Sequence, residues 1–182
     1  LILAAFVSLF PFYFMFVSGT NNNTEILSVP PKLSIGTALL DNFAILHDKM
    51  NIAMSIFNSV FISVVYTLLA VLLFSAAGYA LAKYEFKGKN LIFAFIMGSM
   101  MIPAVVMYVP LFEMMIKLQM TDTYSSVILP MLANAFGIFL MRQNMLEFPT
   151  ALIEAGRIDG LSETSIFFRI VLPNVKPAIG AL

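Results

Sequence analysis

The chain has 182 residues, of which 60% are hydrophobic and only 11% are charged. A soluble domain is about half apolar and about a quarter charged, so this composition indicates a membrane protein. Ten basic and ten acidic residues cancel, which leaves no positive excess for binding nucleic acid. The sequence has no cysteine and a single histidine, His47, so we expect no disulfide, no metal site and no catalytic site.

Four windows of the sequence lack Asp, Glu, Lys and Arg. They cover residues 1–24, 50–82, 90–112 and 123–141, and they are 24, 33, 23 and 19 residues long. A helix needs about 20 apolar residues to cross the hydrocarbon core of a bilayer, so each window predicts one crossing. The second window is longer than an upright crossing needs, so we assign its first residues to the membrane surface.

The sequence therefore predicts an all-α membrane protein, a polytopic bundle of transmembrane helices. We place these helices at residues 1–17, 57–82, 91–116 and 124–141, with the start of a fifth helix at residues 174–182. The fifth breaks off after about one turn, and the first residue is not a methionine. We therefore expect the native sequence to be longer.

The basic residues predict the orientation of this bundle. If residues 18–56 and 117–123 form extracytoplasmic loops, and residues 83–90 and 142–173 form cytoplasmic loops, the inner side, including Lys176 just beyond the second inner loop, carries seven basic residues and the outer side three. The inner residues are Lys83, Lys87, Lys89, Arg142, Arg157, Arg169 and Lys176, and the outer ones are Lys32, Lys49 and Lys117. Cytoplasmic loops carry an excess of Lys and Arg, which favours this topology.

Several segments carry residues that suit close packing or bending. The small residues at positions 75–78 would let helix backbones approach closely. In the third span, Pro103 would interrupt the hydrogen-bond ladder and Pro110 would end or kink the helix, which is either an ordinary kinked helix or one that moves during transport. In the fourth span, Asn134 would face a pathway or bond to a neighbouring helix. We also expect a short helix near residues 37–47.

The second inner loop, residues 142–173, has the pattern of two short helices. Pro149 suits the first turn of a helix over residues 150–158, and Gly160 stands where a left-handed terminal residue is needed. Ser162 can cap a second helix that stops before Pro173. With Lys176 just beyond it, the loop carries four basic and four acidic residues, so we expect it to dock on a partner protein rather than lie on lipid. Its exposed apolar residues would be Leu152, Ile153, Ile158 and Leu161.

The same loop resembles the EAA loop in the membrane subunits of ABC importers. The matching residues are Glu154-Ala155-Gly156, Gly160 and Ile170-Val171-Leu172-Pro173, with Gly156 where the family usually has alanine. Further matches, typical of the carbohydrate branch, are Asn58-Ser59, Gly78-Tyr79-Ala80-Leu81-Ala82, Met101-Ile102-Pro103, Val109-Pro110-Leu111 and Phe148-Pro149. Within that branch, the chain is most similar to the maltose-type second permease subunit.

The resemblance implies a permease domain over roughly residues 52–182, with a cytoplasmic helix–Gly–helix coupling loop that docks on an ATPase. Glu154 would pair with a basic residue of the ATPase, Gly160 would form the turn, and Asp159 would brace it. The full set of coupling residues would be Glu154, Ala155, Gly156, Asp159, Gly160, Leu161 and Pro173. The candidates for lining a pathway are Asn134, Tyr108 and Asn58.

The resemblance also implies partners. These are a dimer of ATPase subunits that would bind ATP and Mg, a second permease subunit, an extracytoplasmic sugar-binding protein, and the lipid bilayer of a bacterial or archaeal plasma membrane. The chain itself lacks the phosphate-binding pattern, because Lys83 and Asn90 stand around Gly88-Lys89 where that pattern needs a glycine and a Ser or Thr. We therefore expect that it is not an enzyme and binds no cofactor of its own.

Two other functions remain open at this stage. The chain could be an importer permease for a non-sugar solute, such as a peptide, a polyamine or an oxyanion. It could also be an ion-coupled secondary transporter, which would need ionisable groups inside the spans. Only Glu113, near an outer end, comes close to that requirement.

Overall fold

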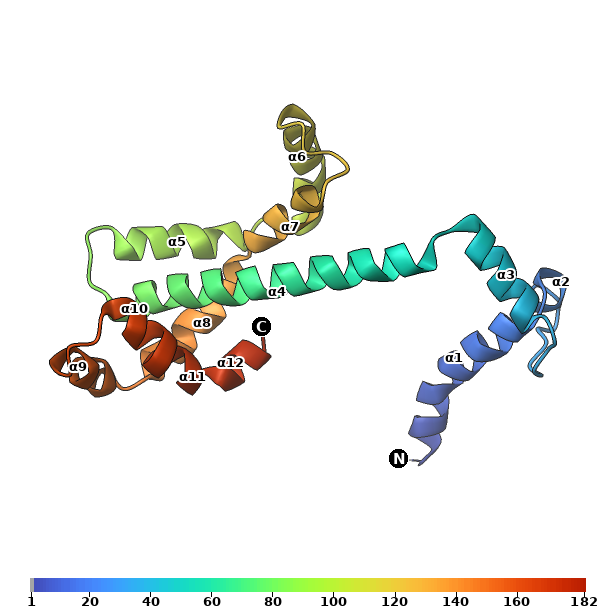
Figure 1. Ribbon diagram of the computed structural model, residues 1–182, viewed down its shortest axis with the longest axis horizontal. Coiled ribbons are helices and arrows are strands. Elements are labelled where there is room, and N and C mark those ends of the chain that lie inside the picture. Colours follow the sequence, from blue (N-terminus) through green and yellow to red (C-terminus); the bar gives the residue numbers. More distant parts are fainter. Residues whose placement is uncertain (1) are drawn as a thin grey trace. The chain divides into compact units, whose positions relative to one another are not determined.

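The computed structural model describes residues 2–182, apart from the side chain of Ile2, so Leu1 of the first predicted span lies outside the described residues. The described residues form helices and no strands. In chain order (Figure 1) the helices are α1 (Ile2–Thr20), α2 (Asn23–Ile26), α3 (Leu39–Lys49), α4 (Ile52–Lys83), α5 (Lys89–Ser99), α6 (Ala104–Lys117), α7 (Tyr124–Leu132), α8 (Ala135–Glu147), α9 (Thr150–Ile158), α10 (Glu163–Ile166), the π-helix η1 (Phe167–Val171), α11 (Leu172–Asn174) and α12 (Lys176–Gly180). Two compact units divide the chain, Leu1–Ser59 and Val60–Leu182.

In the first unit, an ordered loop folds against the end of the apolar helix α1. The side-chain amide of Asn21 donates to the carbonyl oxygens of Val17 (2.8 Å) and Ser34 (2.9 Å). The amide of Asn42, on α3, donates to the carbonyl oxygens of Gly19 and Asn21, at 2.9 Å each. Helix α3 therefore occupies the place of the short helix expected near residues 37–47 and is tied directly to α1.

Helix α4 is longer than the span predicted from the sequence. It begins at Ile52 rather than residue 57 and runs for 32 residues. The side chain of Asn51 explains the early start, because its oxygen accepts a hydrogen bond from the backbone N–H of Met54 (2.9 Å), as a helix N-cap does. Residues 52–56, assigned to the membrane surface, are thus the first turns of this helix.

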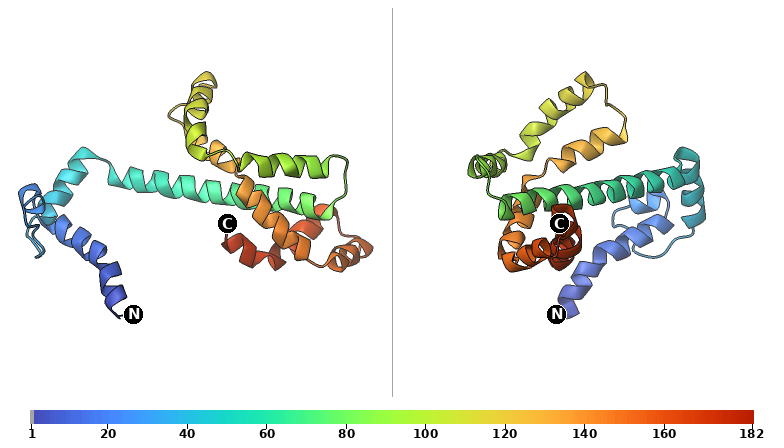
Figure 2. Two further views of the ribbon diagram at one scale, coloured as in Figure 1. Left: turned by 180° about the vertical axis from the view of Figure 1, so that it is seen from behind. Right: turned by 60° about the vertical axis from the view of Figure 1, so that its left-hand side comes forward.

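The third and fourth predicted spans are each made of two helices. Helices α5 and α6 meet at 101°, and α7 and α8 meet at 45°; α6 turns away from the line of α5 in both views of Figure 2. Pro103 is the N-cap of α6, and Asn134 is the N-cap of α8. Pro110, expected to end or kink the third span, does not end the helix, because it lies inside α6.

These breaks change how the spans are counted. Among the described residues, α1 and α4 are each long and apolar enough to cross a membrane alone, and each bent pair passes the same test as a unit. The third span is therefore broken at Pro103 rather than gently kinked. Pro103 has no backbone N–H to continue a helical ladder, which is why the chain can change direction there.

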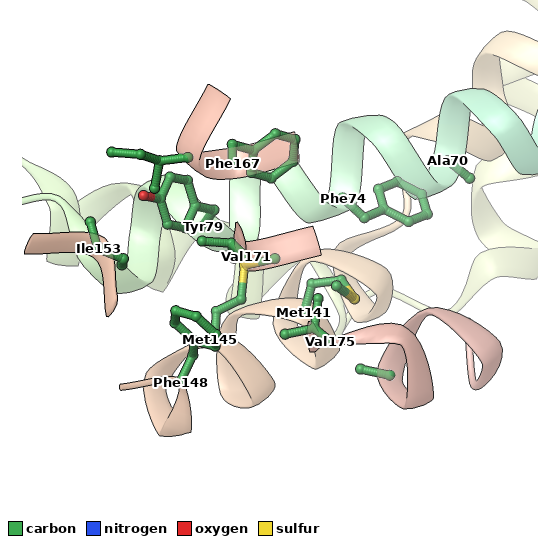
Figure 3. Packing of buried hydrophobic residues seen from close by; sticks show 12 residues of the cluster. Ala70, Phe74, Tyr79, Met141, Met145, Phe148, Ile153, Phe167, Val171 and Val175 are labelled. Atoms are coloured by element: carbon green, nitrogen blue, oxygen red, sulfur yellow. The ribbon is translucent and has the colours of Figure 1, made fainter. Parts of the chain in front are cut away.

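The core of the second unit forms where α4 crosses α8. Figure 3 shows Phe74 and Tyr79 of α4 with Met141 and Met145 of α8 in one apolar cluster, which Ile153, Phe167 and Val171 complete. A methyl group added to Gly78 would lie 2.8 Å from the backbone nitrogen of Arg142, and one added to Gly137 would clash with the ring of Phe74. Among the small residues at positions 75–78, Gly78 therefore lets the backbones approach closely, as predicted.

Gly78→Ala should lower the free energy of unfolding by about 1–3 kcal/mol, because its new methyl group would press on the backbone of α8, which cannot move aside cheaply. Reversible unfolding in mixed detergent micelles measures the change. Gly98→Ala is the matched control, since Gly98 is also helical and has open space around it. Equal stability of the two variants would show that the crossing of α4 and α8 is not this tight.

Candidate functional site

Helix α9 buries one face and exposes the other. Ile153 is 1% exposed and, like Gly156, faces the core, where Ile166 and Ile170 pack over the glycine. Glu154 and Ala155 lie on the exposed side. The expected apolar knob is therefore only half correct: Leu152 (45%) and Ile158 (87%) are exposed, whereas Ile153 is buried and Leu161 is half-buried against the core.

The turn after α9 has the geometry predicted for Gly160. This glycine has a φ of +78°, its N–H donates to the Arg157 carbonyl (3.1 Å), and the N–H of Leu161 donates to the Gly156 carbonyl (3.0 Å). This pair of bonds is a Schellman motif, which satisfies the last carbonyls of a helix. The hydroxyl of Ser162 then caps α10 by accepting from the N–H of Ser165 (3.3 Å), so the predicted cap is confirmed.

The prediction that the second helix stops before Pro173 is wrong. Helical structure continues from α10 through the π-helix η1 into α11, which contains Pro173. In η1 the N–H of Leu172 bonds five residues back to the Phe167 carbonyl, and this wider turn leaves room for the proline ring. The side-chain amide of Asn174 donates to the Ile170 carbonyl (2.6 Å) and satisfies it beside the proline.

An ion pair spans the Gly160 turn. The Arg157 guanidinium donates from Nε to Glu163 Oε1 (2.6 Å) and from Nη2 to Oε2 (3.2 Å), and the Tyr84 hydroxyl also donates to Oε2. The bond from Arg157, followed by that from Tyr84, holds the pKa of the Glu163 carboxyl below its ordinary value. The bond to Glu163 in turn raises the pKa of Arg157. Burial, reinforced by the bond to Glu163, raises the pKa of Tyr84.

The sequence reasoning did not find this three-residue network. An available signal was the pair of opposite charges at residues 157 and 163, which flank the turn at Gly160. Tyr84 gave no such signal, because it lies 79 residues away from Glu163 along the chain.

The end of α4 also contacts the start of α9. Lys83 Nζ donates to the carbonyl oxygen of Phe148 (2.6 Å) and to Thr150 Oγ1 (3.2 Å). Nearby, Arg142 Nε donates to the Leu81 carbonyl (3.3 Å), so α8 is bonded to the same end of α4. The end of α4 is thus joined by cationic side chains both to α8 and to the start of α9.

The expected coupling residues fall into three places. Glu154, Ala155, Asp159 and Gly160 are exposed around the end of α9, whereas Gly156 and Leu161 turn toward the core and Pro173 lies beyond η1. Within residues 2–182, no side-chain hydrogen bond or ion pair involves Glu154. Asp159 contacts the turn through its backbone, since its N–H donates to the Ala155 carbonyl (2.9 Å).

Two of the expected pathway residues line hollows beside the bent helices. Tyr108 lines a hollow of about 580 Å³ between α6 and α7, and Asn134 lines a neighbouring one of about 610 Å³. Both hollows share Met107 and Met131. Asn134 Oδ1 accepts from the N–H of Gly137 (3.1 Å), so this side chain caps α8. Asn58 belongs to the first unit, where it is half-buried on α4.

Comparison with known proteins finds a matching family and several relatives with similar sequences. A family model described as "Binding-protein-dependent transport system inner membrane component" matches residues 75–182. The arabinooligosaccharide transport permease AraQ of Halalkalibacterium halodurans is 38% identical over 181 residues, which cover 98% of this chain and 65% of AraQ. The lactose transport permease LacG of Rhizobium radiobacter is 37% identical over 179 residues, with coverages of 98% and 65%. The chain thus spans just under two thirds of these relatives.

One more sequence relative and one solved structure are also similar to this chain. The sn-glycerol-3-phosphate transport permease UgpE of Pectobacterium atrosepticum is 34% identical over 188 residues, covering 100% of this chain and 67% of UgpE. Among solved structures, a chain of a bacterial ABC transporter involved in the import of the acidic polysaccharide alginate matches with a TM-score of 0.83 at 23% identity, covering 98% of this chain and 63% of that one. At this identity the structural match shows a shared fold.

Gly160→Val should open the turn between α9 and α10, because a positive φ costs an L-residue about 1–2 kcal/mol. Apart from Gly160 itself and its two chain neighbours, no described atom lies within 4 Å of the added Cβ, so the effect would come from the backbone alone. Hydrogen exchange at the amides of Gly160's neighbours should become faster. Gly88→Val carries a similar strain (φ +87°) outside this loop and is the control. Unchanged exchange in Gly160→Val would contradict the described turn.

Proposed function

Because this chain belongs to the family of inner membrane components of binding-protein-dependent transport systems, we propose that it is a membrane-spanning permease subunit of an ATP-driven sugar importer. The observation that carries this proposal is the surface of α9, where the unpaired Glu154 stands beside the exposed Ile158. The names of two relatives, an arabinooligosaccharide permease and a lactose permease, support sugar as the solute class.

The surface of α9 is suited to docking on a protein. An exposed isoleucine offers apolar area, an unpaired carboxylate offers a charge for a basic partner residue, and the Schellman turn at Gly160 keeps both in a fixed geometry. The proposed partner is a dimer of cytoplasmic ATPase subunits that binds ATP and Mg. The excess of basic residues in the loops on the same side supports a cytoplasmic position for α9.

The bent helices supply the proposed route. Irregular backbone at membrane depth is tolerated only where it is buried in protein or lines a cavity, and the breaks at Pro103 and Asn134 both border the hollow of about 610 Å³. We assign to the pathway Asn134, which lines this hollow, and Tyr108, which lines the neighbouring hollow of about 580 Å³. Closure of the ATPase dimer would move α9, and the spans would alternately open this region to the outside and the inside of a bacterial or archaeal plasma membrane.

The lining of these hollows favours a neutral solute. The described lining of the two hollows consists of apolar residues, methionines prominent among them, with Tyr108, Asn134 and Ser99 as the polar members. Tyrosine and asparagine can hydrogen-bond to the hydroxyl groups of a sugar. A second permease subunit would complete the route, and an extracytoplasmic sugar-binding protein would deliver the solute to it.

Glu154→Lys should uncouple transport while leaving the chain inserted, because it places a positive charge where a basic residue of the ATPase is proposed to dock. We expect ATP-dependent uptake to fall at least about tenfold, since opposing like charges across an interface costs several kcal/mol. Uptake into vesicles holding the assembled transporter and its binding protein measures this effect.

The matched control for that experiment is Glu147→Lys, which reverses another exposed carboxylate at the end of α8, outside the α9 surface. It should retain uptake. If the Glu154→Lys complex imported solute at the normal rate with normal ATP hydrolysis, α9 would not be the docking helix.

A further inference from the structure

We propose that Lys83 and Tyr84, two successive residues at the end of α4, hold the two ends of α9 and carry its movement into that membrane-spanning helix. The inference rests on the proposed function, because it assigns a route for motion that begins at a docked ATPase. Lys83 and Tyr84 are positioning residues in this account, since neither needs to touch the solute or the ATPase.

The first link reaches the beginning of α9. Helix α8 ends at Glu147 and α9 begins at Thr150, so Phe148 and Pro149 form the joint between them. Lys83 Nζ binds the Phe148 carbonyl (2.6 Å), the acceptor at the C-cap of α8, and also Thr150 Oγ1 (3.2 Å) in the first turn of α9. A cation at this position satisfies terminal carbonyls and suits the negative end of the α8 dipole.

The second link reaches the end of α9. Tyr84 donates to Glu163, and Glu163 holds Arg157 in the last turn of α9 by two hydrogen bonds. The ring of Tyr84 is itself fixed, because its edge meets the ring of Tyr79 with centroids 5.5 Å apart and an angle of 86° between the planes. Tyr79 is in turn buried against Phe167. The hydroxyl group therefore occupies one position rather than many.

The placement of the two links at opposite ends of α9 is what would transmit movement. The helix has nine residues and is about 13 Å long. Its apolar contacts, through Ile153 and Gly156, are non-directional and would let it slide or pivot. A helix fixed at one end can rotate about that end, whereas a helix fixed at both ends must move with the element that fixes it. Lys83 and Tyr84, which fix the two ends of α9, are adjacent residues in α4 and its C-terminal continuation.

The charges of the second link are stable near neutral pH. Tyr84, Glu163 and Tyr79 are the titratable groups that face Arg157 in this network. The pKa of Glu163 is lowered, mainly by Arg157, and the pKa of Arg157 is raised, mainly by Glu163. A lowered carboxyl pKa preserves the ion pair at every pH above that value, so we expect the coupling through this network in the natural protein to be independent of pH between about pH 6 and 8.

The first test removes single bonding groups in the assembled transporter, reconstituted with its ATPase and binding protein. Tyr84→Phe deletes the hydroxyl and keeps the ring, and Lys83→Met keeps the stem and deletes the donor. We expect each complex to assemble and hydrolyse ATP, while the solute imported per ATP falls at least about threefold. Lys83→Arg, which restores a cationic donor, should recover the ratio. Tyr13→Phe deletes a hydroxyl bonded to the Leu33 carbonyl and is the control.

The second test makes the bond between residue 157 and Glu163 depend on pH. A side chain at residue 157 that only packed against its neighbours would not give coupling such a dependence. In Arg157→His, the imidazole Nε2 stands as many bonds from Cα as the arginine Nε and can face Glu163. A histidine that gains a carboxylate partner has its pKa raised above about 6.5, so the link is present at low pH and is lost as pH rises through that pKa. Solute imported per ATP, relative to the natural protein at each pH, should be near normal at about pH 5.5 and several-fold lower at about pH 8.

The outcomes separate this inference from the proposed function. Unchanged ratios in both Tyr84→Phe and Lys83→Met would overturn the inference, and so would loss of the ATPase from either complex, since the links would then serve docking. A flat relative pH profile in Arg157→His would also count against it. Absence of ATP-dependent uptake by the natural complex, or normal coupling in Glu154→Lys, would instead overturn the proposed function.

Discussion

Where α4 and α8 cross, each helix presents a glycine to the other. This close approach determines how near the end of α4 lies to the joint between α8 and α9. Gly78 lies against the backbone of Met141 and Arg142, and Gly137 lies against the ring of Phe74. Because Gly78 brings the backbone of α4 close to that of α8, the end of α4 lies beside the C-terminal half of α8. Arg142 can then bond to the Leu81 carbonyl, and Lys83 can reach the joint before α9.

Two kinds of contact have different roles around α9. Apolar burial of Ile153, Phe167 and Val171 supplies stabilisation without a preferred direction. Hydrogen bonds from Lys83 and Tyr84 supply direction, because each joins a defined donor to a defined acceptor. The same chain can therefore combine a stable core with a helix whose ends are fixed, while the outer face of α9 remains open.

Much of this arrangement could be predicted from sequence, because local chemistry determines it. The charge-free windows predict helices long enough to span a bilayer, and Gly160 predicts a left-handed turn that the backbone bears out. At Pro103 the sequence predicted an interruption but not its angle of 101°. The burial of Ile153 and the bond from Tyr84 to Glu163 could not be predicted, since each depends on residues far apart in the chain. The prediction that the helix stops before Pro173 was wrong because a π-turn accommodates a proline that an α-turn would reject. The assignments of Glu154 to docking and of Tyr108 to a pathway remain predictions.

The π-helix η1 also determines which face the end of the chain turns toward the core. A π-turn holds one residue more than an α-turn, and in a regular α-helix one residue corresponds to a rotation of about 100° about the helix axis. Regular α-helical winding through all of Phe167–Val171 would therefore rotate the residues that follow by about that angle. Val175 and Ala178, which are buried in the core, would then face away from it. The extra residue held in η1 thus keeps the residues on both sides of Pro173 directed toward one core.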